Sequence, residues 1–113
     1  MSSVSLDGRH LAGVRNSADG EVDSSTVFHY REAGGAVWAD YAGGRIRRGH
    51  LIGTRRGDEL DFRYVHLDVD GNTASGHCTS RVEVLDDGRV RLHETWRWES
   101  RDGAGRSVVE ELA

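Results

Sequence analysis

The chain has 113 residues, which is room for one domain, residues 1–113, with one hydrophobic core. Its 15 basic residues, all arginine, are interspersed with 19 acidic residues, and the net charge of -4 argues against a nucleic-acid partner. One cysteine excludes an internal disulfide, and no apolar run approaches the roughly 20 residues of a membrane-spanning helix, so we expect no membrane contact. The opening residues MSSVSLDGRH lack the basic and apolar regions of a secretion signal, which predicts a cytoplasmic protein.

Short clusters of Gly, Asp and Asn divide the chain at even intervals. Between them lie segments rich in Val, Thr, Tyr, Phe and Trp, and the chain contains no proline. The clusters predict turns at residues 16–20, 33–35, 43–44, 56–58, 70–71, 86–88 and 101–105. The strands are therefore expected at residues 5–15, 21–32, 36–42, 45–55, 59–68, 73–85, 89–100 and 106–112. No segment requires a helix.

Eight consecutive strands joined by tight hairpins predict an all-β fold, an eight-stranded antiparallel up-and-down (meander) barrel of the calycin or lipocalin type. Closing the barrel removes the exposed edges that an open meander would keep. A barrel of eight strands is either filled by its own side chains or holds one small ligand. Its function therefore depends on what lines the interior.

The register of the last hairpins follows from the rule that paired strands must bring like faces together. A three-residue turn at 86–88 sets five pairs on the inner face: Val84 with Val90, Val82 with Leu92, Ser80 with Glu94, Cys78 with Trp96, and Gly76 with Trp98. The turn at 70–71 adds Leu60 with Ser80, Phe62 with Cys78, and Tyr64 with Gly76. The same register leaves two opposite-charge pairs outside, Glu83 with Arg91 and Glu59 with Arg81, which supports it.

The register of the strand at 45–55 is open, because its doublet Leu51-Ile52 fits either phase. A three-residue loop at 56–58 would turn Ile46, Arg48, His50, Ile52 and Thr54 inward, whereas a two-residue turn would swap the faces and bring Leu51 in. The strand at 36–42 leaves a similar choice between Trp38 and Tyr41.

The first of these registers predicts an interior too polar for an ordinary filled core. We expect ligand contacts from Arg48, His50, Phe62, Tyr64, His66, Cys78, Glu94, Trp96, Trp98 and Tyr41. In this interpretation the aromatic rings form an apolar wall and the charged groups orient a bound molecule. The alternative is a satisfied internal network, or polar groups that sit at the barrel ends.

Acid–base catalysis is a further interpretation of the polar residues expected inside the barrel. Glu94, flanked by apolar neighbours, would have a raised pKa and act as a general acid or base with His50 or Tyr64. The spacing of His50, His66 and Glu94 matches no metal motif, so no metal is expected, and no cofactor. The lone Cys78 is typical of a small core residue rather than a nucleophile.

The stretches GGAVWADYAGGRIRRGHLIGT (34–54) and LDDGRVRLHETWRWESRDGAGRSVVEE (85–111) resemble a group of small bacterial proteins. That resemblance implies a lipocalin-like or fatty-acid-binding-protein-like barrel. Many members of the group carry the label "N-acetylglutamate synthase". An acetyltransferase of that kind needs an α/β fold and a pyrophosphate-binding loop, and the sequence shows neither.

The leading hypothesis is a barrel that encloses a small, partly hydrophobic molecule with a carboxylate or carbonyl group held by Arg48. The first rival is a barrel enzyme of secondary metabolism, a cyclase, isomerase or dehydratase. The second is a filled barrel that associates through apolar positions such as Trp38 or Val109, which leaves a homodimer open.

Overall fold

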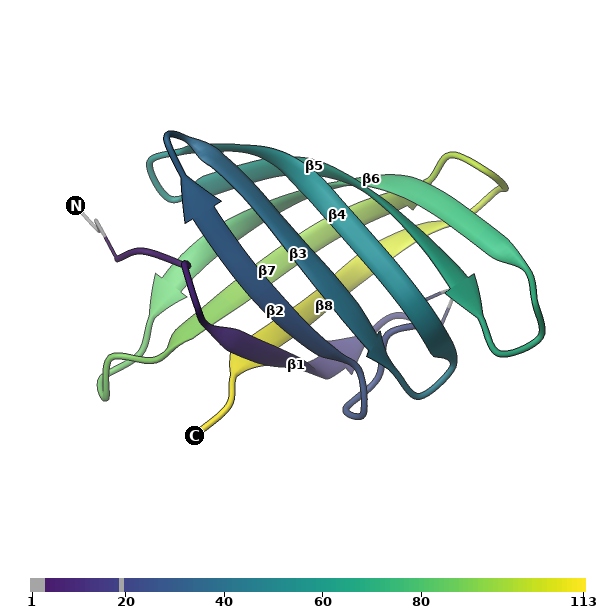
Figure 1. Cartoon of the computed structure of the whole chain (residues 1–113), viewed down its shortest axis with the longest axis horizontal. Coiled ribbons are helices and arrows are strands. Elements are labelled where there is room, and N and C mark those ends of the chain that lie inside the picture. Colours follow the sequence, from purple (N-terminus) through teal and green to yellow (C-terminus); the bar gives the residue numbers. More distant parts are fainter. Residues whose placement is uncertain (1–3, 19) are drawn as a thin grey trace.

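The computed structural model describes residues 4–18 and 20–113, and in them eight antiparallel strands close into one barrel (Figure 1). The strands are β1 (His10–Asn16), β2 (Val27–Ala33), β3 (Ala36–Gly43), β4 (Ile46–Arg56), β5 (Glu59–Asp68), β6 (Thr73–Val84), β7 (Val90–Trp98) and β8 (Ala104–Glu111). Each strand pairs with the next, and β1 pairs with β8 to complete the ring. The predicted fold class is confirmed. No helix long and apolar enough to cross a membrane occurs in these residues.

Tight turns join β2 through β8, as the glycine clusters predict. Between β2 and β3, Gly34 and Gly35 have φ angles of 57° and 82°, and Ala33 pairs with Ala36. Only glycine adopts two such conformations in succession at little cost, and this two-residue turn matches the right-handed twist of the strands. The expected first turn at 16–20 includes Asp19, which lies outside the described residues.

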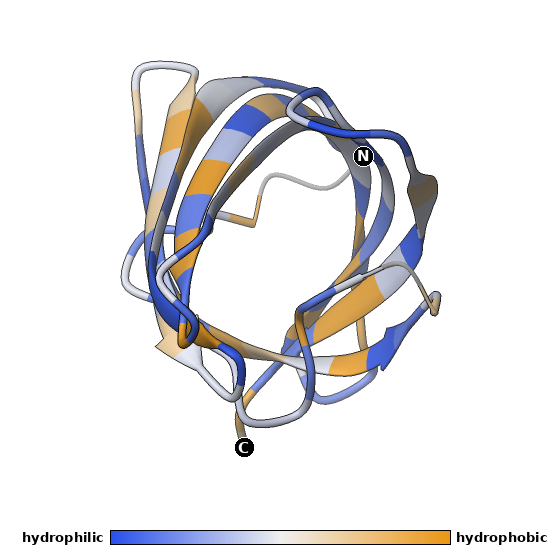
Figure 2. Cartoon of the chain, turned by 90° about the vertical axis from the view of Figure 1, so that its right-hand side faces the viewer, coloured by the Kyte–Doolittle hydropathy of each residue, from blue (hydrophilic) through white to orange (hydrophobic). Residues whose placement is uncertain are grey.

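The predicted register of the later strands is confirmed pair by pair. Ser80 lies opposite Glu94, Cys78 opposite Trp96 and Phe62, and Gly76 opposite Trp98 and Tyr64. On the outer face Glu83 lies opposite Arg91, with 3.5 Å between carboxylate and guanidinium. Figure 2 shows the resulting alternation of apolar and polar bands along the strands.

The choice left open at 56–58 is settled by the two-residue turn Gly57–Asp58, across which Arg56 pairs directly with Glu59. The three-residue loop, on which the inward placement of Arg48 and His50 depended, does not form. The faces of β4 are therefore swapped, and Leu51 is buried while Ile52 is exposed. A bulge between Ile46 and Arg48 shifts the phase by one residue, so that Ile46 is also buried. Arg48, His50 and Thr54 consequently face solvent.

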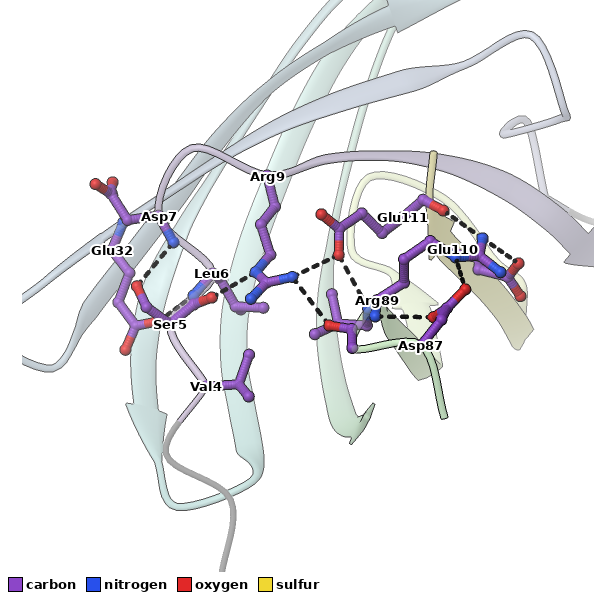
Figure 3. Close-up of polar contacts among 12 residues, drawn as sticks. Val4, Ser5, Leu6, Asp7, Arg9, Glu32, Asp87, Arg89, Glu110 and Glu111 are labelled. Atoms are coloured by element: carbon purple, nitrogen blue, oxygen red, sulfur yellow. Dashed lines mark hydrogen bonds and ion pairs between the residues drawn. The ribbon is translucent and has the colours of Figure 1, made fainter. Parts of the chain in front are cut away.

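The first two strands begin later than expected. The residues before them lie at opposite ends of the barrel, residues 4–9 at one end and residues 20–26 at the other. Near the first end Leu6 is fully buried, and its backbone N–H donates to Glu32 at 2.9 Å. Arg9 fixes this segment by donating to the Ser5 carbonyl at 2.7 Å and pairing with Glu111 at 2.6 Å (Figure 3). We call this the plugged end. The opposite end, where β3–β4, β5–β6 and β7–β8 turn, is the mouth.

Candidate functional site

A cavity of about 50 Å³ lies inside the barrel and reaches towards the mouth. Such a volume is room for a few water molecules. Aromatic rings from four strands supply most of its wall: Phe28, Tyr41, Phe62, Tyr64, Trp96 and Trp98. Phe28 stacks on Tyr41 with 4.7 Å between ring centroids, and Trp96 lies 5.5 Å from Trp98. The strand alternation places these rings together, because each is an inward position of its strand.

Part of this cavity is polar and is built around Glu94. Its carboxyl is buried, with 8% of the residue exposed, and accepts a hydrogen bond of 2.7 Å from the Ser107 hydroxyl. Burial raises the pKa of Glu94 to about 7, against the lowering effect of that hydrogen bond. Ser80, the register partner of Glu94, has a buried hydroxyl with no hydrogen-bond partner among the described residues, and so has Tyr30. Glu94 and Ser107 line the cavity, whereas Ser80 and Tyr30 lie outside its lining. We call these four residues together the polar floor.

Residues 20–22 between β1 and β2 line the cavity at the mouth, where Glu21 contacts the buried ring of His66. The Glu21 carboxylate accepts a hydrogen bond of 2.6 Å from His66 Nε2. Since that nitrogen carries the proton, Nδ1 can accept from the Tyr41 hydroxyl, 3.0 Å away. Arg101 of the β7–β8 turn lies 3.5 Å from the same carboxylate and stacks on Trp98, 4.4 Å from the ring centroid. Glu21 is thus held by one strand residue, His66, and one turn residue, Arg101.

Most of the side chains expected to contact a ligand do meet around this one cavity. They are Tyr41, Phe62, Tyr64, His66, Cys78, Glu94, Trp96 and Trp98. The open choice in β3 is settled in favour of Tyr41, which is buried, while Trp38 lies on the outer face.

The prediction that Arg48 and His50 contact a ligand inside the barrel is wrong. Both lie on the outer face of β4 because of its swapped register, and His50 pairs there with Asp40 at 2.9 Å with 48% of its side chain exposed. His50 therefore cannot reach Glu94, and the expected acid–base pair of these two residues does not exist. Of the expected catalytic residues, Glu94 and Tyr64 do line the same cavity.

Burial also decides the state of the thiol in this wall. The Cys78 side chain is buried, and burial raises the pKa of its thiol well above the usual range. A thiol that stays protonated is a poor nucleophile. Cys78 is accordingly a small wall residue, as its position in the sequence indicates.

Several residues of the site were missed. Phe28 and Ser107 line the cavity, and each follows from strand alternation once the register of its hairpin is known. Leu51 also lines it, as the alternative two-residue turn at 56–58 predicts. The sequence predicts a strand at 21–32 that includes Glu21, whereas Glu21 lies in the segment between β1 and β2, at the mouth. No local signal distinguishes such a loop from a strand end.

In comparison with known protein families, the family model described as avidin-like protein matches residues 4–112. No curated protein matches the chain. The family supports the small ligand-binding barrel that the resemblance implied, and nothing found supports the label "N-acetylglutamate synthase". Because the match spans nearly the whole sequence, the chain belongs to the avidin-like family.

Proposed function

We propose that this protein binds a small, partly hydrophobic molecule whose head group combines N–H donors with a carbonyl, as in an amide or a urea. The observation that carries the proposal is the polar floor. There a buried carboxyl, Glu94, lies near the buried hydroxyls of Ser80 and Tyr30, which lack partners within the described chain. A buried polar group without a partner costs free energy that a ligand or an ordered water can recover.

The chemistry of the floor selects the head group. The Glu94 carboxyl, which lines the cavity, can accept hydrogen bonds from N–H groups. A ligand carbonyl that reaches beyond the lining to Ser80 or Tyr30 would accept from their buried hydroxyls. A carboxylate ligand is less well served, because Arg48 lies outside and the described cavity lining contains no arginine. Of the two head groups that the sequence suggests, we therefore expect a carbonyl at the floor and not a carboxylate.

The aromatic wall would hold the apolar part of the ligand. Rings of this size supply large apolar contact at a low cost in conformational entropy. Because the cavity is only about 50 Å³, a ligand of more than a few heavy atoms must displace side chains or lift the β1–β2 loop. We therefore expect the head group at the floor and the remainder of the ligand towards the mouth.

An enzymatic function has one supporting observation, the pKa of Glu94 at about 7, since a general acid–base group works best near the ambient pH. A cyclase, isomerase or dehydratase would use Glu94 with Tyr64 and without His50. Glu94→Gln distinguishes the cases, because an enzyme would lose turnover of a bound ligand.

A filled interaction barrel has less support. Val109 is fully buried and offers no contact surface, whereas Trp38 does lie on the outer face. A homodimer remains a prediction, for which light scattering coupled to size-exclusion chromatography is the direct measurement.

Titration calorimetry with a panel of aromatic amides, ureas and their N-methylated counterparts tests the proposed ligand class, and biotin, which carries a urea, belongs in the panel. We expect saturable binding that weakens roughly tenfold or more when the N–H donors are methylated. Cys78→Leu fills the cavity and should abolish binding, whereas Thr79→Leu adds the same bulk on the exposed face of the same strand and should not. No saturable binding by any probe, or equal binding to both variants, would contradict the proposal.

A further inference from the structure

The outer surface of β1 to β4 carries an unbroken row of metal-ligating side chain types. His10 on β1 is the register partner of His29 on β2, His29 of Asp40 on β3, and Asp40 of His50 on β4. Figure 1 shows these four strands side by side along the barrel. Neighbouring side chains in such a row have Cβ atoms about 5 Å apart, close enough to share one ion.

His10 and His29 differ from every other histidine of the chain. The sequence contains six histidines, and the remaining four, His50, His66, His77 and His93, each lie within 2.9 Å of a carboxylate oxygen. Within residues 4–18 and 20–113, neither His10 nor His29 has such an acidic partner. Their rings instead contact each other edge to face, with centroids 4.0 Å apart and an interplanar angle of 75°.

The backbone brings these two rings together. The flanking bonds from Tyr30 N–H to the Arg9 carbonyl (2.9 Å) and from Gly13 N–H to the Thr26 carbonyl (3.3 Å) mark the odd-numbered β1 positions as the hydrogen-bonded ones. His10 and His29 therefore form a non-hydrogen-bonded pair, the type in which opposed side chains approach most closely. Both residues are exposed, so an ion reaches them without any rearrangement of the core.

We propose that His10 and His29 form a surface site for one divalent transition-metal ion of the class that prefers imidazole, such as Ni²⁺, Cu²⁺ or Zn²⁺. Imidazole nitrogens bind these ions at about 2.0–2.1 Å in zinc sites, and a pair of rings in contact can both reach one ion. Asp40 is engaged by His50 at 2.9 Å, and no group of three or more ligating residues gathers within the described chain. The protein thus supplies two nitrogens, and water completes the coordination.

Titration of tag-free, folded protein with Ni²⁺ or Zn²⁺ by calorimetry tests this assignment. We expect one equivalent to bind, and His10→Gln or His29→Gln each to weaken binding at least tenfold, because each variant removes one of two ligands. His77→Gln is the matched control. Its imidazole is also on the outer face but pairs with Asp61 at 2.6 Å, and its loss should change the affinity less than twofold.

An NMR titration with Ni²⁺ gives the location independently, since the paramagnetic ion broadens amide signals near it. The signals of β1 around His10 and of β2 around His29 should broaden first, while those of β6 should persist. Binding that survives in both His10→Gln and His29→Gln would overturn the proposal, as would broadening centred on another part of the barrel or the absence of one-equivalent binding.

Discussion

Replacing Glu94 with glutamine should remove a pH-dependent loss of stability from the folded protein. Burial raises the pKa of this carboxyl from 4.5 to about 7. Between these values the unfolded chain has released the proton while the folded barrel still holds it, so the folded state binds more protons. Stability must therefore fall as the pH rises through this window and level off above it.

The size of the effect follows from the shift. A tenfold change in proton affinity is worth about 1.4 kcal/mol, so the full difference for the shift from 4.5 to about 7 is about 3.4 kcal/mol. About 2.5 kcal/mol of this stability is lost between about pH 5 and about pH 8. The remainder has already been lost below pH 5, where the carboxyl of the unfolded chain begins to release its proton. Glutamine cannot titrate. The loss of stability between pH 5 and pH 8 should therefore be smaller in Glu94→Gln than in the wild type, by about 2.5 kcal/mol.

Urea denaturation of both proteins at several pH values, followed by tryptophan fluorescence, measures the difference. All other titrating groups are common to the two proteins and cancel when their pH profiles are subtracted. Glu59→Gln, an exposed carboxyl on the outer face of β5, is the control and should keep the wild-type profile. Parallel profiles for wild type and Glu94→Gln would refute the account of a buried, protonated Glu94.

Two substitutions and one labelling experiment probe the floor, the mouth and the wall. Ser107→Ala removes the hydroxyl that donates to Glu94, so the pKa of Glu94 should rise further. Urea denaturation at pH 8 should show a loss of stability of about 1–3 kcal/mol. An unchanged stability would contradict the hydrogen bond between Ser107 and Glu94. Glu21→Ala breaks the contact with His66, and amides of residues 20–26 should exchange faster in hydrogen-exchange mass spectrometry while the β6 amides do not. The buried Cys78 thiol should react with a disulfide reagent only as fast as the barrel opens, so rapid labelling of native protein would count against its burial.

The later hairpins were predictable because several constraints agreed. At 86–88 the turn length, the inward apolar positions and the outer pair of Glu83 with Arg91 all required the same register. Two interacting strands restrict each other, since a slip of one residue would expose every inward side chain. The wall formed by Cys78, Trp96 and Trp98 followed from that register.

The β4 strand was not predictable in the same way. Leu51 and Ile52 are equally apolar, so the pattern fits either face, and the true phase depends on a two-residue turn at one end and a bulge near the other. Both features are required by closure with β3 and β5, which a local pattern does not encode. This single ambiguity misplaced Arg48 and His50.

The mouth was beyond sequence reasoning for a different reason. The contact between Glu21 and His66 joins residues 45 positions apart through a loop without strand periodicity. Only the closed barrel brings that loop over the cavity. Likewise, Ser107 meets Glu94 because β8 pairs with β7 in a register that no strong turn signal fixed.

Native mass spectrometry after incubation with a cellular small-molecule extract tests the central claim, a ligand held inside the barrel, most directly. The wild type and Thr79→Leu should both carry a discrete added mass that is lost on denaturation, and the cavity-filling variant Cys78→Leu should carry none. A bare protein mass in all three samples, or an adduct retained by Cys78→Leu, would contradict binding in this cavity.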